Sequence, residues 1–261
     1  MSTAETVFHI DPPFAILTFN RPEARNAMTW AMYDALVTAC DCVDADPHVR
    51  VFILRGAGSK AFVSGTDIAQ FQSFNDRQDG IKYEERLDAV LDRLERVTKP
   101  TIAQVQGVAA GGGCAIAFTS DLRVATPEST FGIPIARTLG NCLSGASSSR
   151  LIDLLGPSRV KDLLMTGRLM DGTEAHAAGL IARLVSAGDI DRVTRELALQ
   201  LASNAPLTLY ATKELMRRIA ERRRLQSGND SDIVEMCYTS RDFREGVTAF
   251  LEKRKPKWSG T

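Results

Sequence analysis

The sequence predicts an α/β fold. Over the first half of the chain, short apolar segments bounded by turn residues alternate with amphipathic stretches, and the last third has no strand signal at all. Continuous apolar runs of this kind are typical of strands that are buried on both faces of a sheet. Strand, crossover helix and strand in this order imply parallel pairing, with layers of helices packed on the sheet.

The first elements are a strand pair, a helix and a buried strand. Residues 7–10 and 14–19 read as two strands separated by a proline-containing turn. Thr29 is placed to cap a helix that ends near Asp46, where Asp-Pro stops it. Residues 49–55 (VRVFILR) then predict a strand, and a glycine-rich loop follows it.

The middle of the chain repeats this alternation. Residues 83–97 carry apolar side chains at three- and four-residue steps, which predicts an amphipathic helix. Strands are expected at residues 100–105 and 122–125, with a glycine triplet and a small-residue helix between them. From about Ser144 the pattern is helical apart from residues 180–185.

We therefore divide the chain into a core, residues 1–195, and a helical C-terminal region, residues 196–261. The length permits one large domain or one domain with a small appendage. The helical region is expected to be either a subdomain or an assembly element.

Composition excludes several classes of function. Lys plus Arg and Asp plus Glu number 32 each, so no bulk charge favours nucleic acid or an anionic membrane. No stretch approaches the roughly 20 apolar residues that span a bilayer, and the first residues do not resemble a signal peptide. Five cysteines, an odd number, argue against a disulfide framework and indicate a reducing cytoplasm. They form no metal-ligand grouping, so no metal site is expected.

Two glycine-containing loops carry the functional signal. Residues 61–68 (AFVSGTDI) and residues 111–113 (GGG) each precede a helical stretch. Glycine lets the backbone approach a ligand closely, and the N–H groups at a helix start attract anions. A glycine triplet also allows tight helix packing, and this alternative stays open. The chain lacks the phosphate-loop and dinucleotide fingerprints. The other anion that suits two convergent N–H groups is the oxyanion of an acyl or enolate intermediate.

Five segments together resemble the crotonase superfamily, the enoyl-CoA hydratase/isomerase family. They are AFVSGTDI (61–68), GVAAGGGCAIAFTSDLRVAT (107–126), TFGIP (130–134), AAGLI (177–181) and EGVTAFLEKRKPKW (245–258). Their order and spacing match the family, and the resemblance covers essentially the whole chain. It implies a spiral of ββα units with a helical C-terminal trimerisation region, in homotrimers or in hexamers built as dimers of trimers.

The resemblance also implies a ligand and its contacts. An acyl-CoA or enoyl-CoA is the substrate, so coenzyme A belongs to the substrate and no separate cofactor is expected. The backbone N–H groups of Thr66 and Gly112 are the implied oxyanion donors. Phe250 and Lys253 match positions that reach the adenine end of a CoA bound by a neighbouring subunit. The loops that would line the CoA groove contain Glu23, Ala24, Arg25, Ser64, Gly65, Asp67 and Ile68. Within these loops, Asp67 is more readily a helix cap and loop brace than an acid or base.

The chain departs from the family at the two catalytic glutamates. Hydratases of the family use both to hold water and move protons, whereas here the matching positions are Ala115 and Ile135. Arg137 and Asn141 are our candidates for substitute catalytic groups, because one can orient a carboxylate and the other can position a water. Cys142 is either a nucleophile or a buried structural thiol, and no activating base is visible.

Three functions remain open from the sequence. The first is an enoyl-CoA hydratase/isomerase-like enzyme, a lyase with displaced catalytic groups, acting in fatty acid metabolism. The second is another enolate chemistry on a CoA thioester, such as decarboxylation or thioester hydrolysis, which does not need the two glutamates. The third is a paralogue that binds CoA thioesters without turnover.

Overall fold

Two β-sheets form the core of the protein. The structure is a computed structural model that describes residues 2–3, 5–74, 76–225 and 229–261. In this part of the chain the larger sheet has seven strands in the spatial order β1 (Ser2–Thr3), β2 (Thr6–Asp11), β3 (Phe14–Phe19), β4 (Val51–Gly56), β6 (Thr101–Val105), β8 (Leu122–Ala125) and β11 (Arg183–Leu184). The pairs from β3 to β11 are parallel, and β1–β2 and β2–β3 are antiparallel.

The smaller sheet consists of short strands that follow those of the larger one. Its spatial order is β10 (Met170–Asp171), β9 (Thr130–Gly132), β7 (Val108–Ala110) and β5 (Ala61–Val63). Along the chain β4 leads to β5, β6 to β7 and β8 to β9, and helices follow each pair. This repetition of ββα units confirms the predicted spiral.

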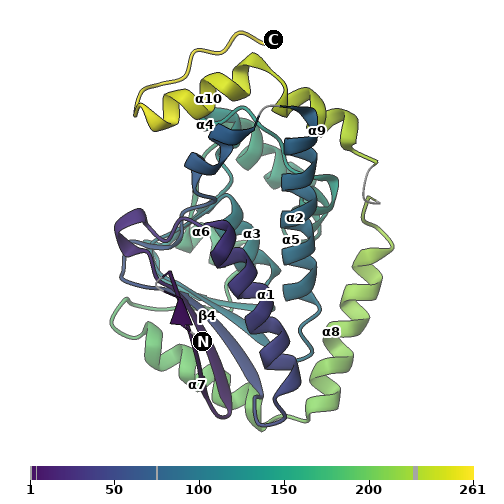
Figure 1. Cartoon of the computed structure of the whole chain (residues 1–261). Coiled ribbons are helices and arrows are strands. Elements are labelled where there is room, and N and C mark those ends of the chain that lie inside the picture. The colour runs from purple at the N-terminus through teal and green to yellow at the C-terminus, as the bar shows by residue number, and fades with distance from the viewer. Residues whose placement is uncertain (1, 4, 75, 226–228) are drawn as a thin grey trace.

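Helices cover both faces of the larger sheet. The helices of the described residues are α1 (Trp30–Ala45), α2 (Arg77–Glu95), α3 (Gly112–Thr119), α4 (Ile135–Thr138), α5 (Gly145–Thr166), α6 (Gly172–Ala177), α7 (Ile190–Ser203), α8 (Pro206–Glu221), α9 (Ser231–Tyr238) and α10 (Arg241–Leu251), with 3₁₀ turns η1 (Pro22–Ala24) and η2 (Ile68–Ser73). Figure 1 shows α1 and α2 side by side on one face and α7 on the other. In Figure 1, α8 runs along the flank of the molecule, and α10 and α4 lie together at the end that carries the C-terminus.

The alternation of side chains along β4 explains why the sheet is buried on both sides. Phe52 and Leu54 belong to the main core beneath α1, α2 and α3. Val51 and Ile53 point the other way and pack in a second cluster with Leu197 of α7. The unbroken apolar run at residues 51–54 is the sequence consequence of this double coverage.

Helix starts follow capping rules. The Thr29 side chain accepts a hydrogen bond from the N–H of Met32 at 3.3 Å, which confirms the predicted cap of α1. Helix α2 begins at Arg77, six residues before the predicted start at residue 83. Asp76 caps it in a capping box, so the polar first turns are stabilised by the cap rather than by an apolar face.

Several other elements of the structure differ from those predicted from the sequence. The short strands β5, β7 and β9 were missed, because three-residue strands carry almost no periodicity and form by pairing with each other. The strand expected at residues 180–185 is reduced to β11. The predicted boundary between residues 195 and 196 falls inside α7, which is continuous across that position. Within the described residues, no helix is both long and apolar enough to cross a bilayer.

Candidate active site

The two glycine loops emerge from adjacent parallel strands. Strands β5 and β7 pair with Val63 opposite Ala109. The carboxyl ends of neighbouring parallel strands lie at one edge of a sheet, which is where open α/β sheets bind ligands. A Cβ built on Gly111 would lie 3.5 Å from the Cα of Gly65, so the two loops are in contact.

Each glycine of this junction has a distinct structural reason. Gly65 and Gly111 have φ values of +119° and +52°, which L side chains rarely adopt. A Cβ on Gly113 would lie 2.1 Å from the carbonyl oxygen of Val63, so α3 packs on β5 only with glycine there. Packing therefore explains the third glycine of the triplet, and the middle one, Gly112, lies against the Tyr33 hydroxyl.

The backbone N–H groups of Thr66 and Gly112 have no acceptor within the described part of the chain. Gly112 is the first residue of α3, where an N–H has no partner inside the helix. On the other loop, the N–H of Met28 donates to the carbonyl oxygen of Gly65 at 2.8 Å, and the carbonyl oxygen of Met28 accepts from the N–H of Asp67 at 2.9 Å. The N–H of Thr66, which lies between these two residues, takes part in neither bond. Two donors without acceptors thus lie on two loops that touch.

Three hydroxyl groups surround this junction. The Thr66 hydroxyl lies 2.8 Å from the hydroxyl of Tyr33 and 2.8 Å from that of Tyr83. A Cβ on Gly112 would lie only 2.5 Å from the Tyr33 hydroxyl oxygen. Burial raises the pKa of both tyrosines well above the usual range, so both hydroxyls stay protonated at neutral pH.

A cavity of about 650 Å³ opens from the two loops. Its wall includes every residue predicted for the oxyanion donors and the CoA groove, together with one of the two substitute catalytic groups: Thr66, Gly112, Asn141, Glu23, Ala24, Arg25, Ser64, Gly65, Asp67, Ile68, Phe250 and Lys253. Such a volume is ordinary for a small-molecule site.

Two other candidates lie outside this wall. Arg137, the other substitute group, is exposed on α4, next to Gly167, and does not line the cavity. Cys142 is half-buried with its Sγ 3.8 Å from the carbonyl oxygen of Ile233 and does not line the cavity either. This position favours a structural role for the Cys142 thiol over a role as nucleophile.

The predicted CoA loops are braced by short-range bonds. The N–H of Ser64 donates to the carbonyl oxygen of Arg25 at 3.1 Å, which ties the two loops together. Asp67 accepts from the N–H of Ala69 at 3.2 Å and pairs with Arg21 at 3.0 Å. Its predicted role as cap and brace is confirmed.

The C-terminal helix also reaches this cavity. Phe250 and Lys253 line the cavity of their own chain, at the end of α10 and just beyond it. Their contact with a CoA bound by a neighbouring subunit stays a prediction.

A buried carboxyl group was missed by the sequence reasoning. Ala115 and Ile135 line the cavity, and neither offers an acid or base. Glu84 of α2 lines it as well and is only 3% exposed. The available signal was its spacing: residue 84 lies three positions before Leu87 and seven before Leu91, on the apolar face of the helix. A carboxylate on an apolar face is a candidate functional group.

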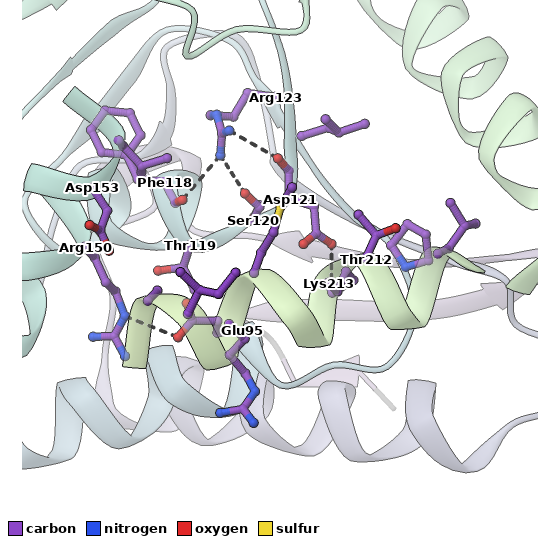
Figure 2. A pocket seen from close by; sticks show the side chains of 18 of the residues that line it. Glu95, Phe118, Thr119, Ser120, Asp121, Arg123, Arg150, Asp153, Thr212 and Lys213 are labelled. Carbon is purple, nitrogen blue, oxygen red and sulfur yellow. Dashed lines mark hydrogen bonds and ion pairs between the residues drawn. The ribbon is translucent and has the colours of Figure 1, made fainter. Parts of the chain in front are cut away.

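A second cavity of about 610 Å³ lies under α8, and its charged groups are paired. Figure 2 shows ion pairs between Lys213 of α8 and Asp121 and between Arg150 and Glu95. Their nitrogen–oxygen distances are 2.5 and 3.6 Å. Arg123 reaches backbone carbonyl oxygens, among them that of Ser120 at 2.5 Å. The other arginines of its wall also have carboxylate partners, namely Arg217 with Glu214, Arg223 with Asp153 and Arg224 with Glu95. The arrangement is that of an ion-pair network which holds α8 to the body.

Comparison with known proteins identifies the family. A sequence model described as enoyl-CoA hydratase/isomerase matches residues 12–261. The chain belongs to the enoyl-CoA hydratase/isomerase family. It is 33% identical over 247 residues to the short-chain-enoyl-CoA hydratase of Clostridium acetobutylicum, with 92% of each chain covered. It is also 34% identical to the carnitinyl-CoA dehydratase of Salmonella arizonae, with 95% of each covered.

Solved structures extend the likeness to the whole fold. Methylmalonyl-CoA decarboxylase in complex with 2-nitronate-propionyl-CoA is similar with a TM-score of 0.90 at 28% identity, over 100% of both chains. An enoyl-CoA hydratase/carnithine racemase from Magnetospirillum magneticum has a TM-score of 0.80 at 29% identity, covering 100% of this chain and 97% of that one. The family thus includes relatives named for different reactions of CoA thioesters.

Proposed function

We propose that the protein is an acyl-CoA thioester enzyme of the enoyl-CoA hydratase/isomerase type that stabilises an enolate. The thioester carbonyl oxygen accepts hydrogen bonds from the N–H groups of Thr66 and Gly112. The observation that carries this proposal is the meeting of the two glycine loops, each with a backbone donor that lacks an acceptor. Such donors stabilise developing oxyanion charge, typically by about 3 to 4 kcal/mol for each one.

The enolate is the intermediate that this site suits. Proton loss or carbon–carbon cleavage next to a thioester moves an electron pair onto the carbonyl oxygen, where the two donors bind it. No cofactor beyond the CoA portion of the substrate is needed for this step. Because the five cysteines are free thiols, we place the protein in a reducing compartment such as the cytoplasm.

Decarboxylation is the second candidate. Loss of CO₂ from a malonyl-type thioester generates the enolate without a base, so the alanine and isoleucine at positions 115 and 135 do not obstruct it. The high structural similarity to a methylmalonyl-CoA decarboxylase, with a TM-score of 0.90, also favours decarboxylation.

The reaction is tested with a panel of enoyl-, acyl- and malonyl-type CoA thioesters, followed by mass spectrometry. A mass gain of one water on crotonyl-CoA identifies hydration, and loss of CO₂ identifies decarboxylation. Release of free CoA identifies thioester hydrolysis. Tight binding with no product from any thioester contradicts the proposal and leaves a binding paralogue.

We also propose that the chain assembles as a homotrimer or as a hexamer. Helix α8 has no buried residue and exposes Leu207, Leu215, Met216 and Ile219 by 58% to 80%. Apolar helix faces of this kind mark interaction sites. Light scattering at micromolar concentration is expected to give three or six chains, with a melting temperature that rises with concentration. A monomer contradicts the assembly.

A further inference from the structure

Glu84 is a buried carboxyl group that is held by hydrogen bonds from uncharged donors. Its Oε1 accepts a hydrogen bond from the Tyr238 hydroxyl at 2.5 Å, and its Oε2 accepts one from the N–H of Ser144 at 3.1 Å. Three elements therefore meet at this group: α2, the start of α5 and the end of α9. Among the described residues, no ion pair joins it to a basic side chain.

The charges around Glu84 oppose its ionisation. Burial raises the pKa of Glu84 to about 8, and the bonds from Tyr238 and Ser144 only partly offset that rise. Asp88 and Asp230 raise it further. The titratable groups that face the carboxyl from the surrounding elements are Tyr33 of α1, Tyr83 and Asp88 of α2, Asp230 and Tyr238 of α9 and its cap, and Cys142 of the loop before α5. Arg150 lies beyond Asp88, 3.5 Å from its Oδ1.

Asn141 completes the polar part of the cavity. Its Nδ2 donates to the Tyr238 hydroxyl at 2.9 Å, while its Oδ1 is buried and has no hydrogen-bond partner within the described residues. Both Asn141 and Glu84 line the cavity. A buried acceptor without a partner costs about 1 to 3 kcal/mol, so it suits a site where a water or a ligand hydroxyl donates.

The carboxyl lines the same cavity as the proposed oxyanion donors. Tyr83, its neighbour on α2, contacts the Thr66 hydroxyl, and the ring centroids of Tyr83 and Tyr238 are 6.0 Å apart. A Cβ on Gly80 would lie 2.4 Å from the Tyr238 ring, so glycine at this position lets α9 come close to α2. The acid, its hydrogen-bond donor and the thioester donors thus share one cavity.

We propose that Glu84 moves the proton at the α-carbon of the bound acyl-CoA, with Tyr238 and Asn141 as positioning residues. This rests on the proposed function. As an acid, the carboxyl loses its O–H proton to the enolate, whose electron pair forms the new C–H bond while the thioester C=O re-forms. The resulting carboxylate keeps its bonds from Tyr238 and Ser144. As a base, it takes the same proton back and regenerates the enolate.

The test is hydrogen exchange into a saturated thioester. The full chain is incubated with butyryl-CoA in D₂O, and deuterium uptake at the α-carbon is followed by mass spectrometry. We expect uptake that rises with pH to a plateau with a midpoint near 8, because exchange needs the carboxylate. Glu84→Gln should slow uptake by at least about 100-fold with an unchanged dissociation constant for butyryl-CoA.

Glu85→Gln is the matched control. It makes the same chemical change one residue along the same helix, at an exposed position, and should exchange as the wild type does. Equal uptake by Glu84→Gln and the wild type overturns the role of Glu84 and leaves the enolate proposal standing. A wild type that binds butyryl-CoA without uptake overturns both.

Tyr238→Phe distinguishes catalysis from structure and decides the case if Glu84→Gln does not fold. It keeps the carboxyl but removes a bond that favours the carboxylate, so the exchange midpoint should move to higher pH. A purely structural Glu84 predicts no such movement, and an unmoved midpoint overturns the proposal.

Discussion

Two cavities lined by the described residues have similar volumes but differ in how their polar and charged groups are paired. In the cavity under α8, each basic side chain of the wall has a carboxylate or carbonyl partner, as Figure 2 shows for Arg123, Arg150 and Lys213. In the cavity at the glycine loops, two backbone donors and one amide oxygen lack partners within the described residues, and a buried carboxyl has no cation.

This difference separates a structural cavity from a candidate active site. Under α8 the arginines and the lysine are paired with carboxylates or carbonyl oxygens, although Arg150 Nε and Nη1 and Arg224 Nε have no hydrogen-bond partner within the described residues. Fixed donors and acceptors that lack a partner destabilise the free protein, but they can form hydrogen bonds to a substrate when it binds. The pairing of charged side chains, together with the unpaired backbone donors at the glycine loops, thus distinguishes the two cavities, whereas their volume does not.

The largest expected effect tests the backbone donor of Gly112. Because a side chain there meets the Tyr33 hydroxyl, both variants are made in a Tyr33→Phe background. Gly112→Pro removes the N–H at the first position of a helix, where proline is tolerated, and Gly112→Ala keeps it. We expect the proline variant to turn over about 100- to 1000-fold more slowly than the alanine variant in a steady-state assay. Equal rates, or an equal loss of CoA-thioester binding, contradict the oxyanion role.

The next effect concerns stability and pH. The pKa of Glu84 is raised from 4.5 to about 8 by burial, so the wild type loses stability as pH rises between these values. Glu84→Gln lacks this titration. In urea unfolding, the stability of the variant relative to the wild type should increase by about 2 to 3 kcal/mol from pH 5 to pH 7. A difference that does not change with pH means that the carboxyl titrates normally.

A smaller effect is expected in the cavity under α8. Glu95→Gln weakens the paired bonds to Arg224, both at 2.5 Å, and removes a partner of Arg150. We expect a loss of about 1 to 2 kcal/mol in unfolding free energy, with turnover within about twofold of the wild type. A large loss of turnover at full stability would give this cavity a functional role and break the comparison.

The smallest effect is expected for Arg137→Ala. This arginine is exposed and outside the wall of the candidate active site, so turnover should stay within about twofold, as for ordinary surface substitutions. A loss of tenfold or more, measured with the thioester that the panel identifies, would show that α4 moves toward the substrate on binding.

The sequence by itself determined the fold class and the position of the two glycine loops. Uniformly apolar runs such as residues 51–54 of β4 specify strands covered on both faces, and the glycines at 65 and 111 specify backbone conformations that other residues fit poorly. These are local properties, written in neighbouring residues, and the family motifs repeat them in a fixed order. Every residue predicted for the CoA groove accordingly lines one cavity.

The tertiary structure decided which polar groups share that cavity. Glu84 lies 60 positions from its partner Ser144 and 154 from Tyr238, so no local pattern joins them. Arg137 and Asn141 lie close together in the sequence, yet only Asn141 lines the cavity. Hydrogen-bond partners and burial depend on how α2, α5 and α9 pack, because packing brings distant residues together and excludes water from them.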